Sequence, residues 1–362
     1  MSSIDISSQV STMEQLEFHV TTVQIINDEM MVEGDIAATE DAFAKLVLAL
    51  YGIICVVGIT GNLLVAIVLL RVPSLRSNTS DFLVHLAIAD SLVSLLVIPY
   101  FMVQRSTSAS PGIFGEFWCR FYTSQFVFWC LATVSVMSLI AVNLERYVAI
   151  VSPHKYKTVF TKQNKYIMIL AIWILAVVTE SAVIIFNGID DNECIFIGWP
   201  SRGAQLGFGL YGFALKFLGP LTVMVYAQAK VISTLNRQVK TLTSRSAAIA
   251  NPRDQREMWQ LRASQTLVKT LLACVITFAV CWAPNQIWFL LFNFDVPLTP
   301  GGHFHHITII LAVGNSCVNP VIYTMTNKPF RKGIREVFCK QRDSNQVGDS
   351  GAATGTASTE TI

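Results

Sequence analysis

The sequence predicts an all-α membrane protein: a seven-transmembrane helix bundle with a short amphipathic cytoplasmic helix after the seventh span. The 362 residues are 52% hydrophobic and only 14% charged. Their mean hydropathy of +0.51 is too high for the surface of a soluble domain. A helix needs about 20 apolar residues to cross roughly 30 Å of hydrocarbon. Blocks of that length lie at approximately residues 46–70, 82–104, 121–144, 166–187, 206–232, 267–293 and 304–325.

The basic residues predict how these spans are oriented. Most of the 26 lysine and arginine residues lie in segments 71–81, 146–165 and 230–269 and after residue 327. Positive charge is retained on the cytoplasmic side of a membrane, so these segments are expected to be cytoplasmic. The first 44 residues contain acidic residues but no lysine or arginine. We therefore expect an extracellular N-terminus, a cytoplasmic C-terminus and insertion directed by the first span rather than by a signal peptide.

Composition divides the chain into four regions. They are a disordered acidic extracellular tail (1–44), a seven-transmembrane domain (45–327), an amphipathic cytoplasmic helix (328–340) and a disordered cytoplasmic tail (341–362). The acidic tail either attracts basic peptides or is a solvated spacer. The cytoplasmic tail is rich in serine and threonine, which are sites for phosphorylation.

Three of the eight cysteines differ from the others, which lie within apolar blocks. Cys119 and Cys194 fall in the expected outer loops on the oxidising side of the membrane, so a disulfide between them is predicted. Cys339 follows a short basic amphipathic stretch beside the membrane. That position is typical of palmitoylation, and the alternative is an unmodified thiol.

Charged residues also interrupt the apolar spans. Glu145, Arg146 and Tyr147 stand at the inner end of the third span, and Asp90 lies in the middle of the second. An ionisable group at membrane depth costs about 2.5–3.5 kcal/mol on insertion scales, so it usually faces the protein interior or a water-filled cavity and marks function. An acid beside an arginine predicts a latch, by which we mean an ion pair that can close and open. The alternative is an arginine that snorkels to the interface.

The polar and proline interruptions form an ordered set. From the first span to the seventh they are Gly61-Asn62; Leu86-Ala87-Ile88-Ala89-Asp90; Glu145-Arg146-Tyr147; Trp173; Pro220 with Tyr226; Phe278 with Cys281-Trp282-Ala283-Pro284; and Asn315-Ser316 with Asn319-Pro320-Val321-Ile322-Tyr323. From about residue 44 to 340 the chain resembles the rhodopsin-like (class A) G-protein-coupled receptors. The resemblance implies a plasma-membrane receptor, not an enzyme, that binds an extracellular ligand and activates heterotrimeric G proteins. It implies further partners, namely arrestin and a receptor kinase at the C-terminal tail and the lipid bilayer, but no nucleic acid.

The resemblance also implies an activation switch. In such receptors the arginine is held by its neighbouring acid at rest and swings to meet the G protein on activation. The matching residues here are Glu145, Arg146, Tyr147, Phe278, Trp282, Pro284, Asn319, Pro320 and Tyr323. Many relatives add a second acid at the inner end of the sixth helix, where this chain has Ser264. Constitutive activity is therefore a hypothesis.

A sodium pocket is implied around Asp90. A buried carboxylate needs partners, and the candidates that converge on it are Ser135, Asn315, Ser316 and Asn319. In the family, this arrangement resembles a site where sodium, an allosteric ion, favours the inactive state. The alternative is a water-filled hydrogen-bond network without an ion. No other cofactor is expected.

Two spacings depart from the family pattern. Cys119 lies farther from Arg146 than is usual, which predicts an irregular turn in the outer part of the third helix. Tyr226 lies closer to Pro220 than is usual, and Gln228 fills the expected tyrosine position. Either the proline or the tyrosine is therefore out of register.

The expected ligand is a neuropeptide. The third span has no aspartate to anchor an amine, and the seventh has no lysine to bind retinal. The predicted pocket consists of Gln104, Gln125, Phe128, Trp129, Glu180, Lys216, Gln286, Phe289 and His305. Lys216 meets either Glu180 or a ligand carboxylate, because a charge inside a span needs a partner.

Other readings remain. A receptor for a non-amine small molecule or odorant is the alternative within the family. A channel or transporter is the alternative outside it, and the lack of an internal repeat argues against that class. The segment His303-Phe304-His305-His306 is either an ordinary loop-to-helix junction or a zinc site.

Overall fold

A computed structural model describes residues 6–103, 108, 110–248 and 252–346, with side chains described for 39–103, 108, 110–245 and 253–338. Gln104 of the predicted pocket and the side chain of Cys339 lie outside the described residues. The chain divides into two compact units, Met1–Leu50 and Tyr51–Ile362, which are treated separately.

The first unit consists of the N-terminal part of α1 (Ile6–Arg71). The helix differs from the disordered tail that composition predicts for residues 1–44. Residues 6–44 contain no proline and only Gly34 as a glycine, so no residue in them is a strong helix breaker. The pair Lys45–Asp41, at 2.6 Å, is exposed and adds little stability, as is usual for surface ion pairs.

Seven helical segments of the described chain are long and apolar enough to span a membrane. These segments are Thr39–Arg71, Asn78–Met102, Ile113–Val151, Lys162–Ile185, Arg202–Arg245, Arg253–Asn293 and His303–Thr326, and each one overlaps a predicted block. The second to the seventh span are each built from one or more helical elements. In chain order these are α2 (Asn78–Val97) with η2 (Ile98–Met102); α3 (Ile113–Trp118), η3 (Cys119–Thr123) and α4 (Phe126–Val151); α6 (Lys162–Ile185); α7 (Arg202–Phe213), η4 (Ala214–Leu218) and α8 (Gly219–Ala248); α9 (Pro252–Asn293); and α10 (His303–Thr326).

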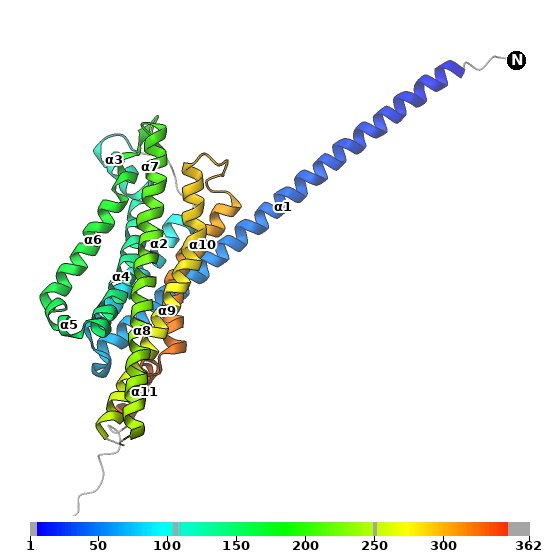
Figure 1. The fold of residues 1–362 in the computed structure, drawn as a ribbon. Coiled ribbons are helices and arrows are strands. Elements are labelled where there is room, and N and C mark those ends of the chain that lie inside the picture. The colour runs from blue at the N-terminus through cyan, green and yellow to red at the C-terminus, as the bar shows by residue number, and fades with distance from the viewer. Residues whose placement is uncertain (1–5, 104–107, 109, 249–251, 347–362) are drawn as a thin grey trace, which may run out of the picture. The chain divides into compact units, whose positions relative to one another are not determined.

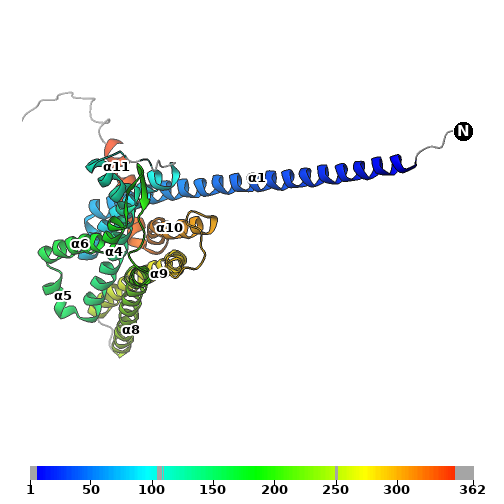
Figure 2. The same ribbon diagram turned by 90° about the horizontal axis from the view of Figure 1, so that it is seen from above.

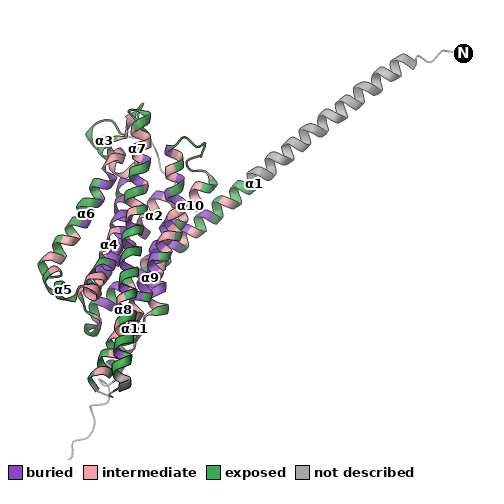
Figure 3. Ribbon diagram, viewed as in Figure 1, coloured by how far each residue is buried: buried purple, intermediate pink, exposed green. Residues whose placement is uncertain are grey.

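Helix α4 is the core of the second unit. It packs against α2, α6 and α8, while α9 packs against α7, α8 and α10. The span containing α4 is 67% buried over its most apolar part, whereas α6 is only 22% buried (Figure 3). Figure 1 shows these helices running side by side, and Figure 2 gives the view from above. The third span is therefore the most deeply buried of the seven.

Local sequence signals set where several helices begin. Ser77 caps α2 in a capping box, in which the Ser80 N–H donates to Ser77 Oγ at 3.1 Å and the Ser77 N–H donates to Ser80 Oγ at 2.7 Å. Thr161 and Ser201 cap α6 and α7 in the same position. These side chains satisfy backbone N–H groups that a helix leaves free in its first turn.

The outer part of the third helix is irregular, which confirms the prediction from the Cys119 spacing. The π-helical turn η3 separates α3 from α4, and Gln125, just before α4, has a left-handed backbone with φ of 65°. A π turn takes up extra residues per turn relative to an α-helix. The extra length between Cys119 and Arg146 is accommodated there.

Another π turn, η4, precedes Pro220 in the fifth span. Beyond the proline, Tyr226 is 56% exposed, whereas Gln228 is 3% exposed and its Nε2 donates to Asn143 Oδ1 at 2.6 Å. Tyr226 is therefore the residue that is out of register, and Gln228 faces the interior.

Shorter elements complete the second unit. The turn η1 (Pro73–Leu75) and helix α5 (Pro153–Val159) lie between spans, and β1 (Asn187–Asp190) pairs antiparallel with β2 (Glu193–Phe196). Helix α11 (Lys328–Gln346) follows the seventh span, as predicted, and continues past the expected boundary at residue 340. We call the end of the bundle that carries Cys119 the disulfide end, and the end that carries Arg146 the arginine end.

Candidate functional site

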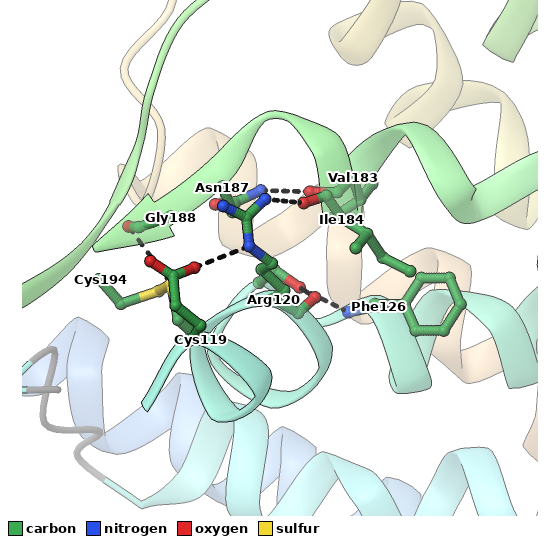
Figure 4. Close-up of a disulfide and its surroundings, with 10 residues drawn as sticks. Cys119, Arg120, Phe126, Val183, Ile184, Asn187, Gly188 and Cys194 are labelled. Atoms are coloured by element: carbon green, nitrogen blue, oxygen red, sulfur yellow. Dashed lines mark hydrogen bonds and ion pairs between the residues drawn. A yellow bond between two sulfur atoms is a disulfide. The ribbon is translucent and has the colours of Figure 1, made fainter. Parts of the chain in front are cut away.

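The disulfide end is held by a covalent bond between the third span and the β-hairpin. Cys119 and Cys194 form a disulfide with a Cα–Cα distance of 5.4 Å, which confirms the predicted pairing (Figure 4). Arg120, next to Cys119, pairs through Nε with Glu116 Oε2 at 2.8 Å and donates through Nη1 to the Ile184 carbonyl at 2.8 Å. The start of the third span is thus fixed to the end of α6.

The arginine end is organised around the Glu145 carboxylate, which is fully buried. Arg146 donates to it twice, from Nε to Oε2 at 2.6 Å and from Nη2 to Oε1 at 2.7 Å. Thr79 Oγ1 donates to Oε2 at 2.7 Å, and the Tyr156 hydroxyl donates to Oε1 at 2.5 Å. Charge-assisted, two-point arginine–carboxylate contacts are among the strongest hydrogen bonds in proteins. Each carboxylate oxygen accepts two of these bonds.

Tyr156, on α5 outside the spans, is an uncharged donor at physiological pH. Burial raises the pKa of Tyr156 to about 12, and the hydrogen bond to Glu145 and the charge of that carboxylate act in the same direction. A negative Tyr156 would face a negative Glu145, so the neutral phenol is favoured.

Ser264 lies half-buried on α9. It shares a helix face with Leu261 and Val268, which belong to an apolar cluster with Tyr147 and Ile150 of α4. The sixth span is thus held near the arginine through apolar contacts.

Asp90 is fully buried in the middle of the bundle. Ser135 Oγ donates to its Oδ1 at 2.5 Å, and Asn319 Nδ2 donates to its Oδ2 at 2.9 Å. Asn315 and Ser316 are also buried, and Asn315 Oδ1 has no hydrogen-bond partner among the described residues.

A small cavity beside this cluster is lined by Ser135, Trp282 and Ser316, together with apolar side chains. The cavity thus reaches from the Asp90 cluster to the aromatic side chains of the sixth span.

The aromatic residues of the predicted switch lie next to the two helix prolines. Phe278 and Trp282 are buried with ring centroids 6.0 Å apart, and Pro284 lies within α9 two residues beyond Trp282. Pro320 lies within α10, and Tyr323, three residues beyond it, is buried. Proline removes a backbone N–H donor and is a common cause of helix kinks.

The structure brings part of the predicted ligand pocket together. Glu180 and Lys216 pair at 2.6 Å, which decides between the two predicted partners of Lys216 in this state. The Lys216 ammonium also lies 6.0 Å from the Phe289 ring centroid. These three residues come from three different spans and meet at one point.

The remaining pocket residues contact their own neighbours. Trp129 Nε1 donates to Gln125 Oε1 at 3.2 Å, Phe128 is fully buried, and Gln286 is buried with Oε1 unpartnered among the described residues. His305 stacks on Trp288 with ring centroids 3.9 Å apart. Within the described part of the chain, no three His, Cys, Asp or Glu side chains are grouped to hold a metal ion, so the zinc reading of the histidine segment has no support.

Three contact residues were missed at the sequence level. Thr79, Thr133 and Tyr156 each donate to a buried carboxylate. Tyr156 carried a weak signal, because it is an aromatic residue between Lys155 and Lys157 in a basic loop. The two threonines carried none, since threonine is common in membrane helices.

The seven-span bundle with these sites is that of a membrane receptor, and the chain belongs to the 7 transmembrane receptor (rhodopsin family), whose family model matches residues 61–323. Members of this family are G-protein-coupled receptors and not enzymes.

Relatives extend over most of the chain. It is 30% identical over 315 residues to the galanin receptor type 1 of Rattus norvegicus, covering 84% of this chain and 86% of the relative. It is 29% identical over 338 residues to the allatostatin-A receptor of Bombyx mori, covering 89% and 87%. It is 28% identical over 307 residues to the somatostatin receptor type 3 of Rattus norvegicus, covering 82% and 68%.

Proposed function

We propose that this protein is a plasma-membrane receptor for an extracellular peptide and that it activates heterotrimeric G proteins by releasing Arg146 from Glu145. The observation that carries the proposal is the buried Glu145 carboxylate with its two bonds from Arg146. The N-terminus is extracellular and the C-terminus cytoplasmic, which the distribution of basic residues supports.

The arginine is suited to a switch because its two states differ in a defined contact. At rest the guanidinium is neutralised by Glu145 and is largely shielded, with 17% of its side chain exposed. Once the sixth span moves away from α4, the guanidinium can turn toward carbonyl or carboxylate oxygens of a G protein. A ligand drives this change only as far as it binds the open state more tightly than the closed one.

A peptide ligand is supported by the relatives and by two sequence exclusions. The relatives carry the names of receptors for galanin, allatostatin-A and somatostatin. The third span has no aspartate between Arg120 and Leu144, and the span 304–325 has no lysine, which argues against amine ligands and retinal. A non-amine small molecule or odorant remains the second candidate, and the relatives do not favour it.

We also propose that the Asp90 cluster holds an allosteric sodium ion. The oxygen donors fit a hard cation, because carboxylate, hydroxyl and amide oxygens converge there and Asn315 Oδ1 lacks a partner among the described residues. Asp90, Ser135, Asn315, Ser316 and Asn319 would hold the ion. Its positive charge would offset the cost of a buried carboxylate and stabilise the packed, inactive bundle.

Further partners are proposed from the sequence. Arrestin and a receptor kinase act at the serine- and threonine-rich C-terminal tail, whose residues 347–362 lie outside the described chain. Cys339 is a proposed palmitoylation site beside the bilayer, on a helix whose basic residues suit anionic lipid.

A signalling screen tests the proposal. Cells that express the full chain with a promiscuous G protein would be exposed to galanin, allatostatin-A and somatostatin peptides and to a wider peptide and small-molecule library. We expect a peptide to raise signalling and Arg146→Ala to abolish the response at unchanged surface expression. Arg76→Ala, which alters another cation of the arginine end, is the control. Full signalling by Arg146→Ala would refute the mechanism, and responses only to small molecules would refute the ligand class.

A further inference from the structure

The Glu180–Lys216 pair is an unusual feature of the disulfide-end half of the bundle. Two full charges lie within spans, with the Glu180 side chain 1% exposed and the Lys216 side chain 13% exposed. Thr133 Oγ1 donates to Glu180 Oε1 at 2.6 Å, and Lys216 Nζ donates to Oε2 at 2.6 Å. Burying a charge pair costs desolvation energy that its mutual attraction barely repays, so stability alone is a weak reason for it.

The pair faces the interior of the bundle. Thr133 belongs to α4, Glu180 to α6, Lys216 to η4 and Phe289 to α9, so the pair and its contacts come from four different spans. Phe289 lies two helical turns from Trp282 toward the disulfide end, a rise of about 10 Å. Lys216 is therefore at the depth where a ligand entering between the helices from the disulfide end would stop above Trp282.

The lysine has hydrogen-bonding capacity that the described residues do not use. An ammonium carries three N–H donors, and one of them meets Glu180. The two Glu180 oxygens are each engaged, one by Thr133 and one by Lys216, so the carboxylate is fixed in place. A ligand acceptor at this point would give a second partner to an ammonium that is largely shielded from water.

The charge balance of the pair selects the kind of acceptor. Glu180 already neutralises Lys216, so an incoming carboxylate would share one cation with a second, fixed carboxylate, which is repulsive. An uncharged carbonyl oxygen accepts the same hydrogen bond without that repulsion. The Phe289 ring lies beside the ammonium and packs edge-to-face with Phe208 at a centroid distance of 5.7 Å. These two rings suit an aromatic neighbour to the carbonyl.

We propose that Lys216 and Glu180 form a subsite that takes an uncharged amide carbonyl beside an aromatic group, as at an amidated aromatic end of a peptide, and rejects the corresponding free acid. The inference rests on the proposed function in placing a ligand at this depth. Lys216 makes the contact, and Glu180 sets the selectivity for a neutral group over an acid.

The test uses two probes that differ only in charge, N-acetylphenylalanine amide and N-acetylphenylalanine. Each is added at millimolar concentration to the purified full-length receptor in lipid nanodiscs, and the shift in unfolding temperature is measured. The wild type should be stabilised by the amide and not by the acid. In Glu180→Gln the preference should be reversed, so that the acid binds with roughly tenfold higher apparent affinity than the amide. This is the change expected for one hydrogen bond to a charged group.

Two further variants keep the result interpretable. The double variant Glu180→Gln with Lys216→Arg keeps a cation at position 216, and the guanidinium of arginine does not lose its proton when buried. This double variant should also prefer the acid. Asp81→Asn alters the acid of another lysine pair, Lys165–Asp81, and should behave as the wild type.

Equal shifts with both probes, no shift with either, a wild type that prefers the acid, or a preference unchanged in both Glu180 variants would each overturn the inference. Peptide-evoked signalling is measured separately, so a receptor that responds to a peptide but fails these tests would leave the proposed function intact.

Discussion

Arg146 binds Glu145 through two parallel hydrogen bonds, Nε to Oε2 at 2.6 Å and Nη2 to Oε1 at 2.7 Å. Glu145→Gln keeps the shape of the side chain but removes the charge. Hydrogen bonds to charged groups contribute about 1.5–3 kcal/mol, so the resting state should lose a substantial part of its advantage. We expect basal signalling, normalised to surface expression, to rise several-fold.

The matched control for this change is Asp81→Asn. Asp81 also pairs with a cation, Lys165, at the arginine end of the bundle, but it does not contact Arg146 in the described contacts. Basal signalling that rises equally in both variants would indicate general loosening of the bundle and would contradict a specific latch.

Tyr156→Phe removes one of the four hydrogen bonds to Glu145. The carboxylate becomes less well held, so basal signalling should rise, but less than in Glu145→Gln because the two arginine bonds remain. In the double variant Tyr156→Phe with Glu145→Gln, the two increases in basal signalling should not add, since the Tyr156 hydroxyl acts only through Glu145. Tyr166→Phe, which alters a tyrosine that is 65% exposed, is the control and should be silent.

Tyr156 also predicts how the stability of the folded protein depends on pH. The pKa of Tyr156 is raised to about 12 from its ordinary value of 10.0. A group with a raised folded-state pKa contributes stability that is fully present below the unfolded value and is lost as pH rises through the folded one. The Tyr156 contribution should therefore be constant at physiological pH and decline only from about pH 10 to about pH 12, which thermal unfolding of wild type and Tyr156→Phe against pH would measure.

Ser264→Glu should lower basal signalling. Ser264 shares the α9 face that packs through Leu261 and Val268 against α4, so a carboxylate there would be directed toward the side of the bundle that contains Arg146. It would add a second partner for the arginine and favour the closed state. Ala263→Glu places the same charge on the neighbouring exposed position and should have no effect. An unchanged Ser264→Glu variant would argue that the resting latch is already complete.

The sequence was sufficient for the spans because block length and hydropathy alone determine which segments can cross a bilayer. It also located the irregular third helix, since Cys119 and Arg146 are two fixed marks and the surplus residues between them had to be absorbed in a turn such as η3.

The sequence could not decide what depends on side-chain placement. Residue spacing in the fifth span showed that either Pro220 or Tyr226 is out of register but not which one. Only the hydrogen bond of Gln228 to Asn143 identified Tyr226 as that residue. Lys216 had two candidate partners, because the need of a buried charge for a partner does not name that partner. Thr133 was missed for the same reason: a threonine hydroxyl has no pattern in the sequence that marks its acceptor.

Removal of the Cys119–Cys194 disulfide should destabilise the disulfide end. The bond closes a loop with a sequence separation of 75 residues, and loss of a native disulfide typically costs about 2–5 kcal/mol. Cys194→Ser and the double variant Cys119→Ser with Cys194→Ser should lower the unfolding temperature of the purified receptor to the same extent. A single variant much less stable than the double one would point to mispairing of the remaining thiol instead.

The contact between the fifth and sixth spans depends on Gly209. A Cβ placed on Gly209 would lie 2.6 Å from Asn293 Cβ, so α7 and α9 approach closely at this point. Gly209→Ala should therefore force the helices apart and cost about 1–3 kcal/mol, as overpacking does. Gly207, on the same helix, faces open space, and Gly207→Ala should be neutral or stabilising by up to about 1 kcal/mol, because alanine is the better helix former. Thermal unfolding of both variants in detergent measures the difference, and a Gly209→Ala receptor as stable as Gly207→Ala would show that the two spans are not closely packed there.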